Sequence, residues 1–76
     1  MVSAADTAKR TLVKLIRFLA GVYSVTVDVT RDSREEVVRT AYRALSRKVH
    51  PDKGGSQDDQ KKLNESYQSW CDAARS

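Results

Sequence analysis

Hydrophobic residues recur at helical spacing in three stretches of this 76-residue chain. In the first stretch, residues 7–20, Asp6 or Thr7 can cap the start of a helix and Gly21 can end it. Basic residues lie elsewhere on the helical wheel, so the predicted helix is amphipathic. Its apolar stripe consists of Leu12, Leu15, Ile16 and Leu19.

The second stretch, residues 33–49, predicts a helix that Asp32 or Ser33 can cap. Pro51 disfavours helical geometry at the residue before it, so this helix should end near Val49. Basic side chains step by four residues along a face beside the apolar stripe and should reach solvent. The stripe consists of Val38, Ala41, Tyr42, Leu45 and Val49, and the basic face of Arg39, Arg43 and Arg47.

The third stretch, residues 57–71, follows a turn at residues 50–55, where Gly54 and Gly55 allow the chain to reverse. Ser56 can cap this helix. Its apolar face consists of Leu63, Tyr67 and Trp70. Packing of this face against the second helix predicts an all-α fold, an antiparallel helical hairpin with an additional N-terminal helix.

Residues 22–29 are rich in β-branched side chains, but a lone strand would have no partner in this chain. We therefore predict a short helical turn or an extended connector there. The length suits one domain. We divide the chain into an N-terminal amphipathic helix, residues 1–21, that packs on the core, and a core formed by residues 22–76.

The charge pattern favours an acidic partner. With a net charge of +4 and a pI near 9.5, the chain suits an acidic protein patch, a nucleic acid or an anionic membrane surface, without choosing among them. Lys14 and Arg17 interrupt the apolar stretch at residues 11–27, so we predict no membrane span, while a role at a membrane surface stays open. The single cysteine, Cys71, excludes an intrachain disulfide.

Enzymatic chemistry has little support in this sequence. His50 is the single histidine, and neither a second metal ligand of the Cys/His type nor a nucleophile-base pair accompanies it. We predict a module that is not an enzyme and uses no metal, no cofactor and no small-molecule substrate.

A specific motif lies between the second and third predicted helices. The sequence His50-Pro51-Asp52-Lys53 follows Ala41-Tyr42-Arg43-Ala44-Leu45 and precedes Leu63-Asn64-Glu65-Ser66-Tyr67. With both flanking helices in register, this arrangement resembles the J-domain, the module of DnaJ-type co-chaperones. The resemblance covers about residues 22–70.

The resemblance implies a function and a partner. J-domains bind a seventy-kilodalton heat-shock chaperone in its ATP-bound state and stimulate its ATPase, supporting protein folding or remodelling. The His-Pro-Asp loop is the trigger in that family, and a basic surface of the second helix faces the partner. The partner-binding residues implied here are His50, Pro51, Asp52, Lys53, Arg39, Tyr42, Arg43, Arg47 and Lys48.

The sequence also departs from the J-domain pattern. Gln60 stands where the family usually has a core phenylalanine, and Ser24 and Val27 replace the usual tyrosine and leucine. The core must then be completed differently, and residues 12–19 together with Trp70 can do so. Two alternatives stay open: a basic helical module that binds nucleic-acid phosphates, which we favour less, and a degenerate J-domain with a scaffolding role only. We expect a monomeric module of a larger protein and favour the cytoplasm, with the mitochondrion left open.

Overall fold

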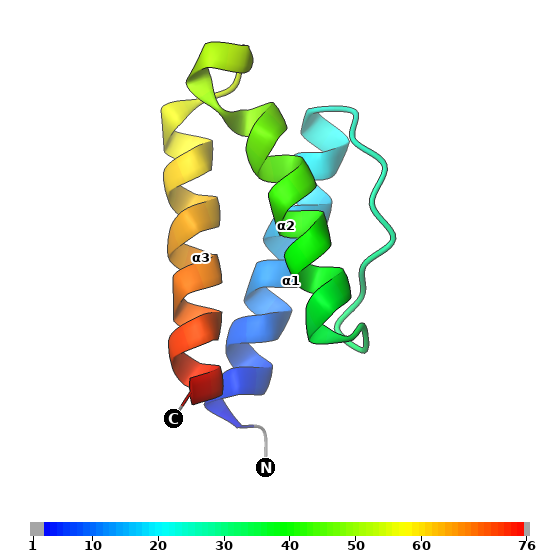
Figure 1. The fold of residues 1–76 in the computed structure, drawn as a ribbon, viewed down its shortest axis with the longest axis vertical. Coiled ribbons are helices and arrows are strands. Elements are labelled where there is room, and N and C mark those ends of the chain that lie inside the picture. The colour runs from blue at the N-terminus through cyan, green and yellow to red at the C-terminus, as the bar shows by residue number, and fades with distance from the viewer. Residues whose placement is uncertain (1–2, 76) are drawn as a thin grey trace.

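Three α-helices form a bundle in the computed structural model, which describes residues 3–75. The helices are α1 (Ala4–Val22), α2 (Glu35–Val49) and α3 (Gln57–Arg75), and a short 3₁₀ helix, η1 (Pro51–Lys53), lies between α2 and α3. Figure 1 shows α2 and α3 running antiparallel, with η1 at the end of the bundle opposite the two termini. The described residues contain no strand, and the predicted all-α fold is confirmed.

The first helix begins earlier than predicted, at Ala4. Ser3 is the capping residue, and its hydroxyl oxygen accepts a hydrogen bond from the backbone N–H of Asp6 at 3.1 Å. The prediction that Asp6 or Thr7 caps this helix is therefore wrong. A serine followed by an acidic residue in the first turn satisfies a free N–H group and places negative charge at the positive end of the helix dipole.

The first helix also ends later than predicted. Gly21 lies inside α1, which continues to Val22. Ser24 then takes the left-handed conformation with φ of 57°, a role that glycine usually plays at a helix end. The backbone N–H of Val25 donates to the carbonyl of Ala20 at 2.8 Å and closes the last turn. The chain beyond this turn is an extended connector without a further helix or strand before α2.

The second helix begins at Glu35, two residues later than predicted. Arg34 is the N-terminal flanking residue and makes no side-chain capping bond. Ser33 does not cap α2, because its hydroxyl instead accepts the backbone N–H of Thr30 at 2.9 Å. The helix ends at Val49, and the third helix, predicted at residues 57–71, extends one turn further to Arg75.

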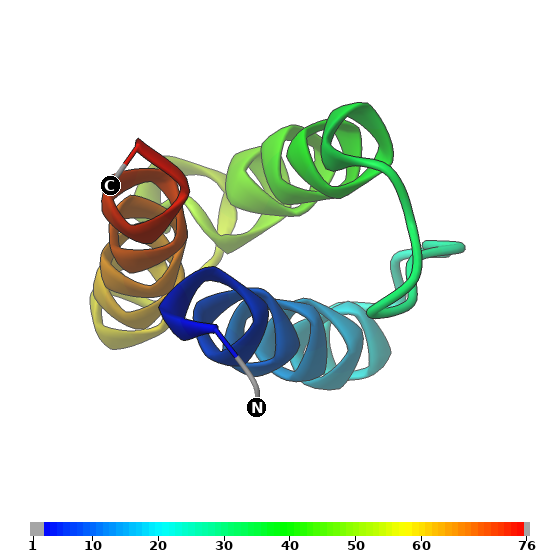
Figure 2. The ribbon, with the colours of Figure 1, turned by 90° about the horizontal axis from the view of Figure 1, so that it is seen from below.

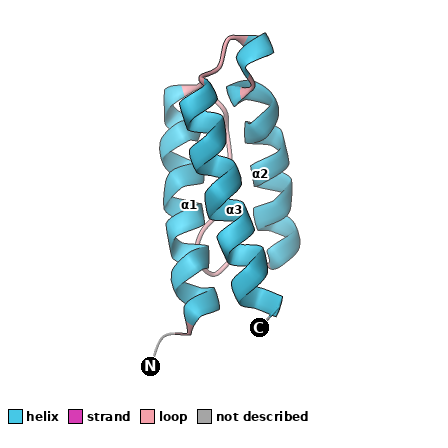
Figure 3. Cartoon of the chain, turned by 90° about the vertical axis from the view of Figure 1, so that its left-hand side faces the viewer, coloured by secondary structure: helices cyan, strands magenta, loops and turns pink. Residues whose placement is uncertain are grey.

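All three helices share one hydrophobic core. α1 packs against α3 more extensively than α2 does, so the additional N-terminal helix is an integral part of the bundle. Figure 2, a view along the helices, shows the three at the corners of a triangle, and Figure 3 shows α3 in front of and between α1 and α2. The buried residues are Leu12, Val13, Ile16, Leu19, Ala20, Val29, Val38, Ala41, Leu45, Val49, Leu63 and Trp70.

An aromatic cluster closes the seam between α2 and α3. The ring of Tyr67 stacks on that of Tyr42, with centroids 3.9 Å apart and planes 5° from parallel. Trp70 meets the edge of Tyr67 at 5.8 Å, a favourable geometry for aromatic pairs. The departure at Gln60 is thus accommodated by a core that α1 and Trp70 complete. None of the helices within residues 3–75 is long and apolar enough to cross a membrane.

Candidate docking site at the His-Pro-Asp turn

The end of α2 folds into a compact turn. Pro51 occupies the first position of η1, where its missing N–H leaves no bond unmade. The carbonyl of His50 accepts hydrogen bonds from the backbone N–H groups of Lys53 at 2.9 Å and Gly55 at 3.1 Å. The N–H of Gly54 donates to the Pro51 carbonyl at 3.2 Å. Three backbone hydrogen bonds within six residues therefore hold the turn in one shape.

Both glycines after the turn are required by this geometry. Gly54 has φ of 87°, a left-handed conformation that side chains disfavour. Glycine is required at position 55 for a different reason, because a Cβ there would overlap the backbone of Val49. The sequence Gly54-Gly55 thus lets the chain pass close to the end of α2 as it enters α3.

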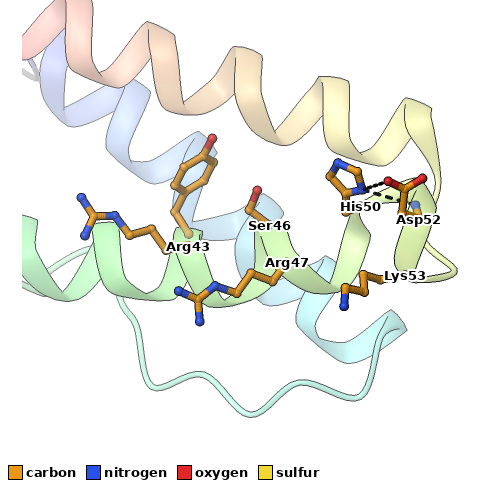
Figure 4. Close-up of a pocket in the computed structure, with 7 residues that line it drawn as sticks. Arg43, Ser46, Arg47, His50, Asp52 and Lys53 are labelled. Carbon is orange, nitrogen blue, oxygen red and sulfur yellow. Dashed lines mark hydrogen bonds and ion pairs between the residues drawn. The ribbon is translucent and has the colours of Figure 1, made fainter.

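His50 and Asp52 contact each other at the outer surface of the turn. The Nδ1 atom of His50 accepts the backbone N–H of Asp52 at 3.3 Å and lies 3.7 Å from its carboxylate Oδ2. In the neutral imidazole the ring proton then sits on Nε2. The Asp52 side chain is 87% exposed, so its carboxylate is free to meet a partner. Figure 4 shows the two side chains together at the end of α2.

A shallow groove of about 440 Å³ joins this turn to the last two turns of α2. Figure 4 shows Arg47 and Lys53 extending to one side of α2, with the His50–Asp52 pair on the other. Within residues 3–75, no ion pair involves Arg43, Arg47 or Lys53. The groove is therefore positively charged along one wall. Its lining consists of Tyr42, Arg43, Ser46, Arg47, His50, Asp52 and Lys53.

Two of the basic residues predicted to face a partner lie outside this groove. The guanidinium carbon of Arg39 sits 6.0 Å from the centre of the Trp70 ring, and its nitrogen lies 3.9 Å from the Glu35 carboxylate. Arg39 thus lines a separate depression between the start of α2 and the end of α3. Lys48 is exposed in the last turn of α2 but does not line the groove of the turn.

Tyr42 connects the groove to α3. Its hydroxyl donates a hydrogen bond to the side-chain oxygen of Asn64 at 2.7 Å, and its ring packs on Tyr67. Burial, followed by the proximity of Tyr67, raises the pKa of the Tyr42 phenol above its usual value, against a smaller opposing effect of the Ser46 hydroxyl. Tyr42 is therefore a neutral hydrogen-bonding group that fixes α2 on α3.

Three residues in or near this site are not among the predicted ones: Ser46, Tyr23 and Asp59. Ser46 lies one helical turn before His50, a spacing that could have placed it in the groove. Tyr23 donates its hydroxyl proton to the Asp59 carboxylate at 2.6 Å and accepts the backbone N–H of Ser56 at 3.1 Å. These bonds tie the end of α1 to the start of α3, directly after the turn. Residues so far apart carry no local signal of this contact.

We predict that Tyr23 stabilises the fold in a pH-dependent way. The bond to Asp59, then burial, raises the pKa of the Tyr23 phenol, against a smaller opposing effect of the Ser56 N–H. A raised pKa means that the stabilisation is complete below the usual tyrosine pKa near 10 and is lost as the pH rises through the raised value. Tyr23→Phe should lower the melting temperature at pH 7, and the difference from the native protein should shrink at more alkaline pH. A difference that stays constant to the alkaline limit of folding would contradict this.

The described part of the chain offers no group of three or more His, Cys, Asp or Glu side chains placed to hold a metal ion. The turn is exposed to solvent. It combines one acidic tip, a histidine that organises the tip, and a cationic wall on a rigid helix.

Comparison with known proteins identifies the family. The DnaJ domain family matches residues 22–75. Over 53 residues the chain is 38% identical to chaperone protein DnaJ 1 of Synechocystis. The aligned region covers 66% of this chain and 14% of that protein. It is 41% identical over 49 residues to chaperone protein DnaJ of Lacticaseibacillus casei, covering 60% of this chain and 13% of that protein. No solved structure gives a significant match.

This chain therefore belongs to the DnaJ domain family, and it is a J-domain of the co-chaperone class. Members of this family are co-chaperones rather than enzymes. The chain spans about 14% of the length of the curated relatives it matches. The match begins at Val22, so α1 lies almost wholly before the region shared with the family.

Proposed function

We propose that this chain binds a seventy-kilodalton heat-shock chaperone in its ATP-bound state and stimulates ATP hydrolysis by that chaperone. The observation that carries the proposal is the exposed His50–Asp52 turn, held rigidly at the end of the basic helix α2. The relatives are named as chaperone proteins, which agrees with a role in protein folding or remodelling.

The cations of α2 would supply the general attraction to the chaperone. Arg43, Arg47 and Lys53 are exposed, and no described carboxylate neutralises them. An acidic surface on the chaperone would meet a positive wall on this module, and such complementarity mainly raises the rate of association. Lys48 and Arg39 would add to the same potential from the edges of the surface.

Asp52 would supply the specific contact. Its carboxylate stands free at the tip of the turn, where it can pair with a basic residue of the chaperone. Pro51 and the three backbone hydrogen bonds of the turn hold this carboxylate in place before binding. Little conformational entropy is then lost on docking, which is the advantage of a preorganised binding element.

Stimulation would arise from a shift in the chaperone's own conformational equilibrium. A module that binds one conformation of the chaperone better than the other shifts the population toward the first. The size of that shift depends on the difference in affinity, so a small change at the turn can remove stimulation while leaving general attraction in place. This distinction between triggering and attraction is what the experiment should resolve.

We expect Asp52→Asn and His50→Gln to abolish stimulation of single-turnover ATP hydrolysis by a purified seventy-kilodalton heat-shock chaperone. The asparagine keeps the shape of the turn but removes the charge, and loss of one partner of a docked charge pair corresponds to a loss of at least about tenfold in affinity. Arg43→Gln combined with Arg47→Gln should instead raise the concentration needed for half-maximal stimulation, because it weakens the attraction and leaves the tip intact.

A matched control removes the same charge elsewhere. Lys61 and Lys62 are exposed on α3 and do not line the groove of the turn, so replacing both by glutamine should leave stimulation unchanged. Full stimulation by Asp52→Asn would refute the proposal. A folded native chain that stimulates nothing would favour a scaffolding role, and salt-sensitive RNA or DNA binding that Asp52→Asn leaves intact would favour a nucleic-acid module.

A further inference from the structure

The outward face of α1 combines exposed apolar side chains with unneutralised cations. Phe18 is 67% exposed and Val22 57% exposed, the two largest values among the large hydrophobic residues that reach the surface. Arg10, Lys14 and Arg17 lie within one or two helical turns of Phe18, and their spacing of three and four residues places them on the same side of the helix. We call this surface, residues Arg10, Lys14, Arg17, Phe18 and Val22, the outer face of α1.

A groove of about 570 Å³ runs along the outer face where it meets the connector before α2. Arg31 of the connector adds a fourth cation to Arg10, Lys14 and Arg17 in the lining of this groove, and Asp32 is the single acidic side chain there. Among residues 3–75, no ion pair involves any of these four cations. Cations outnumber carboxylates four to one in the lining of this groove, so an anionic surface laid along α1 would be attracted to it.

We propose that the outer face of α1 docks on an anionic lipid surface, with its cations at the level of the lipid phosphates and Phe18 inserted between the headgroups. Charge complementarity accounts for the cations, and the exposed Phe18 beside them on the same face of α1 decides between a lipid surface and a soluble anion. A soluble anion would leave the ring of Phe18 in water, whereas the boundary between headgroups and acyl chains buries it. Each basic residue that lies close to an anionic lipid surface contributes about equally to the affinity for that surface.

This surface and the His-Pro-Asp turn occupy different sides of the molecule. In Figure 2, α1 lies at one side of the triangle of helices and α2 at the other. The turn itself projects from the end of the bundle beyond α2 and α3, as Figure 1 shows. A lipid surface along α1 would therefore leave the groove of the turn accessible, so the lipid contact does not depend on the chaperone contact.

Vesicle co-sedimentation tests the lipid contact directly. We expect the full chain to bind vesicles of phosphatidylcholine and phosphatidylserine, not to bind vesicles of phosphatidylcholine alone, and to dissociate at high salt. Lys14→Gln combined with Arg17→Gln should reduce the partition coefficient by about 25-fold, at about fivefold for each cation removed. Phe18→Ala should reduce it by about tenfold.

The matched control is again Lys61→Gln combined with Lys62→Gln, which removes the same charge from α3 and should leave vesicle binding within about twofold of the native value. Circular dichroism and Trp70 fluorescence should be native in all variants, because every altered side chain is exposed. Equal binding to both kinds of vesicle would overturn the proposal, as would equal losses in the α1 and α3 double variants. If Phe18→Ala leaves vesicle binding unchanged, the outer face of α1 would be assigned to a soluble anion. Equally strong binding of inorganic phosphate alone to this face would lead to the same assignment.

Discussion

A Gly55→Ala variant is expected to lose the shape of the His-Pro-Asp turn, because a methyl group at position 55 would overlap the backbone carbonyl of Val49. The overlapping atoms belong to the last turn of α2, so rotation of a side chain cannot relieve the clash. The chain must open, which breaks the hydrogen bonds that the His50 carbonyl accepts from Lys53 and Gly55. We expect the free energy of unfolding to fall by about 2–4 kcal/mol and the proposed stimulation of a heat-shock chaperone to be lost.

Urea unfolding monitored by Trp70 fluorescence measures this loss, and the two other glycines serve as controls. Gly54→Ala places a side chain in open space at φ of 87° and should cost about 1–2 kcal/mol. Gly21→Ala, inside α1 and also in open space, should stabilise the protein by about 0.5–1 kcal/mol. A Gly55→Ala protein no less stable than Gly54→Ala would contradict the close approach of residue 55 to α2.

The positions of the three helices could be predicted because apolar spacing is a local signal that the core then uses. Val38, Leu45 and Leu63, taken from the predicted stripes, are fully buried. The caps could not be predicted with the same certainty, because several polar residues near each helix start are chemically suitable. Ser33 illustrates the reason. Its hydroxyl accepts a hydrogen bond from the backbone N–H of Thr30, and its carbonyl accepts one from the ammonium of Lys9 in α1. The Ser33 hydroxyl is therefore used within the connector rather than at the start of α2.

The same contrast applies to the docking site. The turn from His50 to Gly55 is built from backbone hydrogen bonds between near neighbours, so its residues carry the information for its shape. The resemblance implies that Arg39 faces a partner together with Arg43, and the structure adds that the Arg39 guanidinium lies 6.0 Å from the centre of the Trp70 ring of α3. Only the packing of two helices reveals this, and helix periodicity contains no information about it.

The final prediction concerns the part of the chain that the family match leaves out. A chain shortened to residues 22–76 should not fold, although it contains the whole region shared with the DnaJ domain family. α1 contributes Leu12, Val13, Ile16, Leu19 and Ala20 to the buried core. Burial of a Leu, Ile or Val side chain contributes about 1.5–3 kcal/mol, so these residues together match the whole stability of about 4–11 kcal/mol expected for a domain of this size.

Circular dichroism and Trp70 emission of the shortened chain should therefore be those of an unfolded protein, with the indole in water. Two substitutions within α1 test the same argument in the full chain. Ile16→Ala, at a fully buried position, should cost about 2–5 kcal/mol, whereas Phe18→Ala on the outer face should change stability by less than about 0.5 kcal/mol. A shortened chain that unfolds cooperatively would show that α2 and α3 form a sufficient core alone. If the shortened chain is unfolded, α1 holds those helices in place. The shape of the His-Pro-Asp turn then depends on a helix that lies almost entirely outside the region matched by the family.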